Sequence, residues 1–142
     1  MFALIAAILL AQDHLTLSTP IVAAAPEIGA DSAGYVRIAN HGAADRLVAA
    51  ECACAGRIEI HFVNRSGAKV SMDTLAALDL PAGGIVEIRP GSPLHLMLMD
   101  LKTPLLDGAS VEMTLRFERT GTKTVRFAVV ADTKAAWPPI AR

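Results

Sequence analysis

A histidine and two methionines alternate with leucines in one short stretch of the chain, where residues 94–99 read LHLMLM. In a β-strand alternate side chains share a face, so His95, Met97 and Met99 would stand in a row about 6–7 Å apart along the backbone. Imidazole nitrogen and thioether sulfur are neutral donors, and the soft thioether favours Cu(I) over hard cations such as Mg²⁺ and Ca²⁺. A zinc site would normally add thiolate or carboxylate ligands. The stretch therefore indicates a candidate copper site on one face of a strand.

Two further donors of the same kinds lie upstream. His61 falls on the polar face of a predicted strand, and Met72 follows it in a segment bounded by Gly67 and Pro81. Neutral ligands would leave a Cu(I) site with a net charge of +1, so such a site should lie near the surface rather than in a dry core. A second interpretation, in which these residues bind no metal, stays open at this point. Methionine often fills gaps in hydrophobic cores, and a histidine on a polar face is usually solvated.

The elements that must position these donors are predicted to be strands. From residue 14 onward, short runs of alternating apolar and polar residues are broken by Gly, Pro, Asp and Asn, which is typical of a β-sandwich. On the run that holds His61, the apolar face is predicted to be Ile58, Ile60 and Phe62. Residues 73–80 show the one weak helical period, and the last two strands are expected to form a hairpin. The predicted strands cover residues 35–39, 47–50, 57–62, 86–88, 94–99, 111–117 and 124–130.

Length and charge exclude several classes of protein. The chain has 142 residues, enough for one domain, and its formal net charge of -1 lacks the basic surplus of a nucleic-acid-binding protein. Residues 1–11 are all apolar, which is too short a run to cross a bilayer and is interpreted as a signal peptide for export. No second apolar run of membrane length follows, so no membrane span is expected in the mature protein. Residues 131–142 are expected to form a flexible tail.

The two cysteines, Cys52 and Cys54, are separated by one alanine. They are too few for a disulfide-rich scaffold or a four-cysteine zinc site. A disulfide, a pair of Cu(I) thiolates and a redox switch are all possible functions, whereas the interpretation favoured here is small apolar filler in a loop, because so short a disulfide ring is hard to close. The sequence contains no G-x-S-x-G, phosphate-loop or H-E-x-x-H motif, so it is not expected to be an enzyme.

The order and spacing of the donors resemble a known family. Ten residues separate His61 from Met72, and twenty-two separate Met72 from His95, which is followed by Leu96 and Met97. This pattern resembles the signature of the periplasmic copper chaperones called PCuAC proteins, and the resemblance covers about residues 14–130. Further matching segments are AGY at 33–35, DRL at 45–47, LPAGG at 80–84, HLMLMDL at 95–101, LLDG at 105–108 and TLRFE at 114–118.

The resemblance implies a cupredoxin-like Greek-key β-sandwich and a monomeric periplasmic protein. It implies a Cu(I) site of His61, Met72, His95 and Met97, with Met99 beside it. Family members pass copper to a recipient protein such as the CuA site of cytochrome c oxidase. In two places the chain departs from the family: Phe62 stands where a second methionine is common, and the C-terminus lacks the histidine- and methionine-rich tail of many relatives. The alternative function is a metal-free extracytoplasmic β-sandwich that serves as an interaction module.

Overall fold

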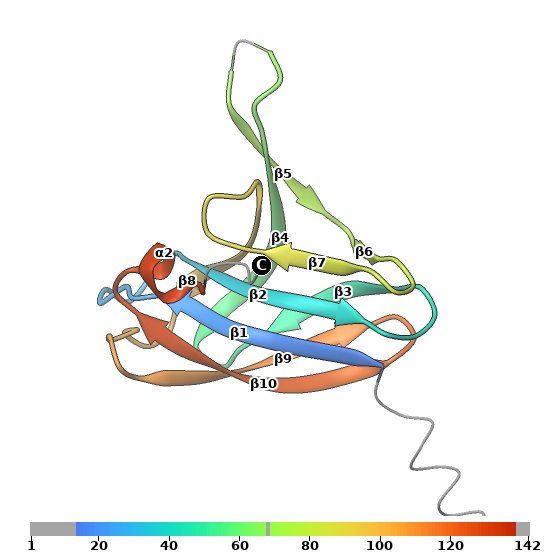
Figure 1. Ribbon diagram of the computed structural model, residues 1–142. Helices are drawn as coiled ribbons and strands as arrows, with labels where there is room; N and C mark the ends of the chain where they lie inside the picture. The colour runs from blue at the N-terminus through green and yellow to red at the C-terminus, as the bar shows by residue number, and fades with distance from the viewer. Residues whose placement is uncertain (1–13, 68, 139–142) are drawn as a thin grey trace, which may run out of the picture.

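A computed structural model describes residues 14–67 and 69–138 and is almost entirely β-structure (Figure 1). The predicted signal peptide at residues 1–11 lies outside the described residues. Ten strands are formed, and a four-residue helix, α2 (Thr133–Ala136), follows the last of them. The strands are β1 (Leu15–Ala23), β2 (Ser32–Asn40), β3 (Asp45–Glu51), β4 (Ala55–Asn64), β5 (Ser71–Leu75), β6 (Leu78–Leu80), β7 (Ile85–Ile88), β8 (Leu94–Leu101), β9 (Ser110–Phe117) and β10 (Gly121–Val130).

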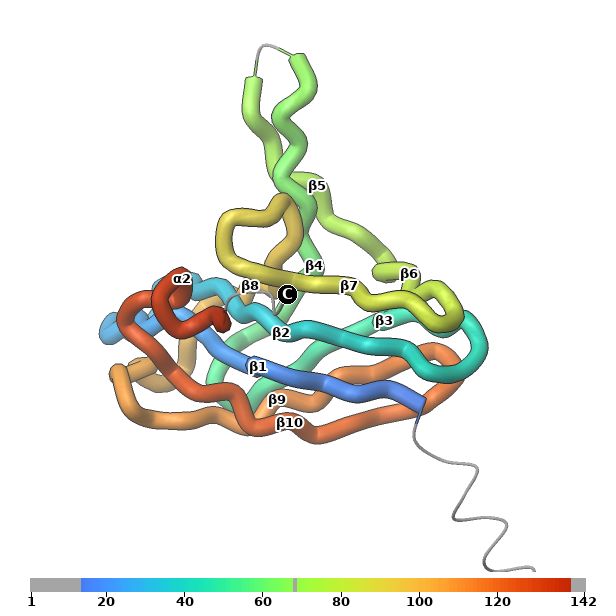
Figure 2. Tube along the Cα trace, in the orientation of Figure 1, coloured from blue at the N-terminus to red at the C-terminus, as the bar shows by residue number. Residues whose placement is uncertain are grey.

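Seven strands form a closed ring. Their order is β4-β8-β2-β1-β10-β9-β3, and a pairing of Ala50 on β3 with Ile58 on β4 joins the two ends. The three short strands are attached to this ring: β5 pairs with β4, β6 with β3 and β7 with β2. The first and last strands lie parallel, with Ile21–Ala23 beside Ala128–Val130, and Figure 2 shows them side by side along the trace. The other strands of the ring pair antiparallel, and the hydrophobic core lies inside the closed ring.

Along the strands of the ring, every second side chain points inward, and these side chains form the core. On β8, Leu96 and Leu98 are fully buried, as their place in the LHLMLM run predicts. The predicted hairpin of the last two strands is confirmed, since β9 and β10 pair antiparallel from Phe117 opposite Gly121 to Ser110 opposite Ala128. Its inward side chains are among the most deeply buried in the described part of the chain: Met113, Leu115, Phe117, Phe127 and Val129.

Two local predictions are wrong. Residues 73–80 are not helical; they lie in β5 and β6 and the short turn between them. Phe62 was predicted to face the core, but 38% of its surface is exposed, whereas His61 beside it is 7% exposed. The physical reason is that β4 and β5 continue beyond the ring as a projecting hairpin (Figure 1), so the apolar face of β4 no longer has a core beneath it at Phe62.

Residues 131–138, expected to belong to a flexible tail, include α2. The carboxylate of Asp132 caps this helix by accepting a hydrogen bond from the backbone N–H of Ala135 at 3.1 Å. The sequence pattern did not indicate this helical turn, because four residues are too few to show a helical period.

A buried carboxylate fastens the β9–β10 turn to the start of β3. Asp45 is 5% exposed and accepts hydrogen bonds from the backbone N–H groups of Arg46 and Arg119 at 2.8 Å. It also accepts from Thr120, through the backbone N–H at 3.0 Å and the hydroxyl at 2.6 Å. Burial would raise the pKa of Asp45, but the hydrogen bonds from Thr120, Arg119 and Arg46 outweigh it, so the pKa lies below its usual value.

Asp45→Ala is expected to lower the free energy of unfolding by about 1–3 kcal/mol at pH 7, because it leaves N–H donors of the turn without an acceptor. The pKa of Asp45 is lower in the folded state than in the unfolded state. The carboxylate therefore contributes its full share to the free energy of unfolding above the unfolded pKa of about 4, and this share is lost as the pH falls through the folded pKa. Urea unfolding at pH 7 and at a series of acid pH values measures this. Asp79→Ala is the control, because Asp79 is an exposed partner of Arg46 and its loss should change stability by less than about 0.5 kcal/mol. If the difference in free energy of unfolding between the wild-type protein and Asp45→Ala stayed constant down to the lowest pH, the ionised carboxylate would not be the source of the stabilisation.

Candidate metal centre

The two histidines of the predicted site are direct cross-strand neighbours. His61 on β4 pairs with His95 on β8, and the centroids of their rings are 5.6 Å apart with the planes at 72°. In the same register, Glu59 lies opposite Met97. Paired residues and residues two apart share a face of a sheet, so these four side chains lie on one side of the β4–β8 pair.

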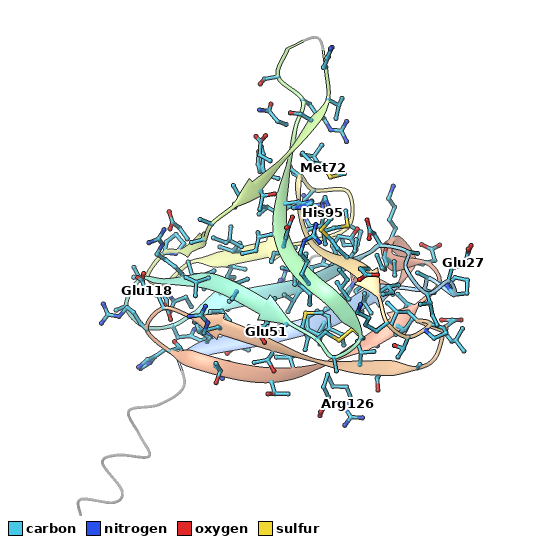
Figure 3. All side chains as sticks on the ribbon, turned by 180° about the vertical axis from the view of Figure 1, so that it is seen from behind. Glu27, Glu51, Met72, His95, Glu118 and Arg126 are labelled. Atoms are coloured by element: carbon cyan, nitrogen blue, oxygen red, sulfur yellow. A yellow bond between two sulfur atoms is a disulfide. The ribbon has the colours of Figure 1, made fainter. Side chains whose placement is uncertain are left out.

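Met72 reaches the same face from β5. It pairs with Val63, which is two residues from His61 on β4. A diagonal neighbour of this kind lies within reach of a long side chain. Figure 3 shows Met72 close to His95 at the base of the projecting hairpin. The structure thus brings all four residues of the predicted ligand set, His61, Met72, His95 and Met97, to one face at one end of the ring.

The exposure of the four donors changes across the cluster. His61 and His95 are 7% and 8% exposed, Met97 is half-buried, and Met72 is 56% exposed. The group therefore runs from the interior to the surface. Among residues 14–67 and 69–138, no three His, Cys, Asp or Glu side chains come together as a metal site. A metal held by these histidines would need the thioether sulfurs to complete its coordination.

Glu59 holds one nitrogen of His61 and leaves the other available. The Nε2 atom of His61 lies 2.9 Å from a carboxylate oxygen of Glu59, whereas Nδ1 is buried and has no hydrogen-bond partner among the described residues. Histidines that bind metals commonly hydrogen bond a carboxylate through the second ring nitrogen. Hydrogen bonds from His61 and then Arg57 hold the pKa of Glu59 below its usual value, so it is an anion at neutral pH. Sequence reasoning missed this role of Glu59, although its position two residues before His61 was a usable signal.

His95 is kept neutral by its surroundings. Burial lowers its pKa, and the neighbouring His61 lowers it further. A neutral imidazole keeps a lone pair on one ring nitrogen, which is the form that binds metals. His95 is therefore ready to act as a ligand without first losing a proton at neutral pH.

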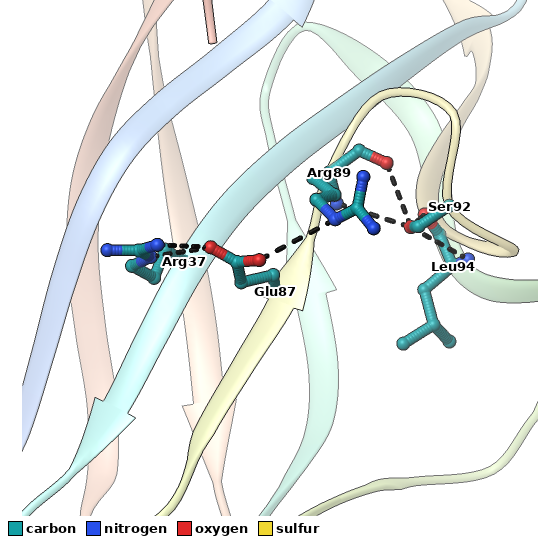
Figure 4. Close-up of polar contacts among 5 residues, drawn as sticks. All are labelled: Arg37, Glu87, Arg89, Ser92 and Leu94. Carbon is teal, nitrogen blue, oxygen red and sulfur yellow. Dashed lines mark hydrogen bonds and ion pairs between the residues drawn. The ribbon is translucent and has the colours of Figure 1, made fainter. Parts of the chain in front are cut away.

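The turn that precedes His95 is fixed by polar contacts (Figure 4). The hydroxyl of Ser92 donates to the backbone carbonyl of Arg89 at 2.8 Å and accepts from the N–H of Leu94 at 3.3 Å. The carboxylate of Glu87 on β7 pairs with both Arg37 on β2 and Arg89, the latter at 3.5 Å. These contacts tie the end of β7 to β2 and order the turn that leads into β8, where His95 is the second residue.

The interpretation of the cysteines as unlinked apolar filler is wrong. Cys52 and Cys54 form a disulfide in the turn between β3 and β4. The turn brings their Cα atoms to 5.0 Å, inside the range of about 4.4–6.8 Å that disulfides use. One intervening residue is therefore enough for both side chains to point to the same side.

The profile of the family described as "Putative lipoprotein LpqE-like" matches residues 15–129. The "Putative lipoprotein Lxx21020" of Leifsonia xyli subsp. xyli (strain CTCB07) is 31% identical over 100 residues, which are 69% of this chain and 60% of that protein. The match thus spans about three-fifths of the relative's length. Among the described residues, no helix is long and apolar enough to cross a membrane.

Solved structures share the fold. The copper-bound PCuAC domain from PmoF2 has a TM-score of 0.73 and 26% identity, over 86% of this chain and 97% of that domain. The solution structure of CuI-DR1885 from Deinococcus radiodurans has a TM-score of 0.65 and 28% identity, over 86% of this chain and 80% of that one. The predicted all-β, cupredoxin-like sandwich is confirmed.

Proposed function

Because the chain belongs to the LpqE-like family, which is the family of PCuAC domains, we propose that it is a copper chaperone that carries Cu(I) on His61, Met72, His95 and Met97. The observation that carries the proposal is the difference in hydrogen bonding between the two ring nitrogens of His61. Its Nε2 is held by Glu59 while its buried Nδ1 has no partner among the described residues and lies in the face that also holds His95. An unpaired buried nitrogen is costly unless something binds it, and a metal ion would satisfy it.

The donor set suits Cu(I). Two imidazoles and two thioethers are neutral, and thioether sulfur selects a soft monovalent ion. The complex would carry a charge of +1, and the carboxylate of Glu59, which already contacts His61, is placed to offset that charge without being a ligand. The site combines buried nitrogens with sulfur at the surface, so the bound ion would be sheltered on one side and accessible on the other.

Delivery to a recipient is the second part of the proposal. Met72, 56% exposed on the projecting hairpin, is the donor that a partner could replace first by ligand exchange. The recipient is a copper protein such as the CuA domain of cytochrome c oxidase, met in the periplasm after export and removal of residues 1–11. The carrier acts as a monomer and catalyses no reaction.

Titration of the disulfide-intact protein with Cu(I) under anaerobic conditions, in competition with a chromophoric Cu(I) chelator, tests the first part. We expect one Cu(I) per chain, with nitrogen and sulfur scatterers in its X-ray absorption spectrum. Absence of Cu(I) uptake would instead favour the metal-free interaction module, and uptake equal to that of a His61→Ala/His95→Ala double variant would show that the histidines are not ligands.

Mixing the loaded protein with an apo CuA domain tests the second part. The expected result is loss of copper from the carrier and its appearance in the recipient, separated by chromatography and measured by metal analysis. If copper binds but never moves to this recipient, the carrier site stands and the named recipient is wrong.

Glu59→Ala is expected to weaken Cu(I) binding by about 10–100-fold, because removing a carboxylate that orients a ligating imidazole typically has an effect of this size. The chelator competition measures it. Glu112→Ala is the matched control, since Glu112 is an exposed glutamate on β9 that pairs with Arg126 on β10. Equal affinities of the two variants would show that Glu59 does not orient His61 for binding.

A further inference from the structure

Cys52 and Cys54 form a second pair of soft donors at the other end of β4. Ala55, the first residue of β4, pairs with Leu101 at the end of β8, whereas His61 pairs with His95 near the start of β8. Six residues of strand separate Ala55 from His61, a distance of about 20 Å. We propose that reduction of the Cys52–Cys54 disulfide opens a second site that binds one Cu(I) between two thiolates.

The disulfide is not needed to hold the turn. It links residues two apart, and the entropy that a crosslink removes from the unfolded chain is smallest for the shortest loops. Backbone hydrogen bonds hold the same turn independently: the N–H of Ala55 donates to the carbonyl of Cys52 at 3.2 Å, and the N–H of Lys102 donates to that of Cys54 at 2.7 Å. Reduction would therefore leave two thiols close together on an intact turn.

The turn offers a suitable place for a soft cation. With the Cα atoms 5.0 Å apart, rotation of the two side chains after reduction would let the sulfurs separate far enough for one cation to bridge them. The backbone N–H of Cys54 lies 3.0 Å from the sulfur of Cys52 and would stabilise a thiolate there. Cys52 also lines a cavity of about 240 Å³, through which a cation could reach its sulfur.

The chemistry balances with a thiol reductant. Two external thiols transfer two electrons and two protons to the disulfide; the Cys52–Cys54 bond breaks, one external disulfide forms, and each cysteine becomes a thiol. One Cu(I) then replaces the two thiol protons and gives a bis-thiolate complex with a charge of -1. The oxidised turn has no thiolate to offer, so metal binding at this place depends on the redox state of the chain.

Counting Cu(I) per chain in both redox states tests the inference independently of the histidine and methionine site. In the His61→Ala/His95→Ala variant, we expect no tightly bound Cu(I) with the disulfide intact and one Cu(I) after treatment with a phosphine reductant and its removal without oxygen. A thiol assay must find two free thiols in the reduced sample. No gain of copper in a sample with two free thiols would overturn the inference, whatever the wild-type protein binds.

A variant and a chemical block provide the controls. The Cys52→Ser/Cys54→Ser variant should bind the same number of Cu(I) ions before and after phosphine treatment. Alkylating both thiols of the reduced wild-type protein should also prevent binding of the added Cu(I). This control replaces the double variant if that variant folds poorly. If copper uptake on reduction persisted in either sample, the thiolates would not be its ligands.

Discussion

His95→Ala is expected to weaken Cu(I) binding by more than about 100-fold. Loss of a partner that only orients a ligand typically lowers metal affinity by 10–100-fold, and loss of a direct ligand should exceed that range. His95 is 8% exposed and packs edge-on against His61, at the buried side of the cluster. Competition with a chromophoric Cu(I) chelator measures the change. His41→Ala is the histidine control, because His41 is exposed and contacts Thr16 instead.

The methionines allow a closer comparison on the same strand. Met97 and Met99 are both half-buried and both project from the outer face of β8, but Met97 lies opposite Glu59 and Met99 opposite Arg57. Met97→Leu should weaken Cu(I) binding at least about tenfold, whereas Met99→Leu should leave it within about threefold, since leucine preserves volume and removes only the sulfur. No loss in Met97→Leu would show that Met97 is not a ligand, and an equal loss in Met99→Leu would show that the two sulfurs contribute alike.

Leu96→Ala is expected to lower the free energy of unfolding by about 2–5 kcal/mol, the range for removing a buried leucine side chain. Leu96 lies between His95 and Met97 but points into the core, where it is fully buried. Copper affinity of the folded variant should stay near that of the wild-type protein. Urea unfolding gives the stability, and an unchanged slope with denaturant confirms that the same surface is exposed on unfolding.

The neighbouring residue provides the contrast. Met97→Leu exchanges side chains of similar size and should change stability by less than about 1.5 kcal/mol. Two adjacent substitutions are thus expected to separate folding from binding: one destabilises the core, and the other removes a donor. If Leu96→Ala cost less than about 1 kcal/mol, the alternation of core and site along β8 would be incorrect.

Much of this arrangement could be predicted because a strand has a period of two. The alternation in residues 94–99 correctly placed Leu96 and Leu98 in the core, with His95 and Met97 on the other face. Periodicity does not give register, however. That His61 lies opposite His95 depends on how β4 and β8 align in the closed ring, and only the resemblance to PCuAC proteins grouped these residues beforehand.

The errors have physical causes outside the local pattern. Phe62 belongs to the apolar face of its strand, but it is the last residue of β4 that pairs with β8, and a pattern cannot show where the core ends. The disulfide depends on a tight turn that brings Cys52 and Cys54 together, which their separation alone does not reveal. Glu59 was missed because its importance comes from one contact, its hydrogen bond with His61.

The parallel pairing of β1 with β10 has a consequence for biosynthesis. Residues 21–23 are made early, yet they must wait for residues 128–130 before the ring can close. A ribosome-bound chain therefore exposes unpaired strand edges until nearly all of the domain has been translated, and closure brings together segments more than a hundred residues apart. Closure of the ring should therefore be late and slow for a domain of this size, which leaves an unfolded interval in which holding factors could bind the chain.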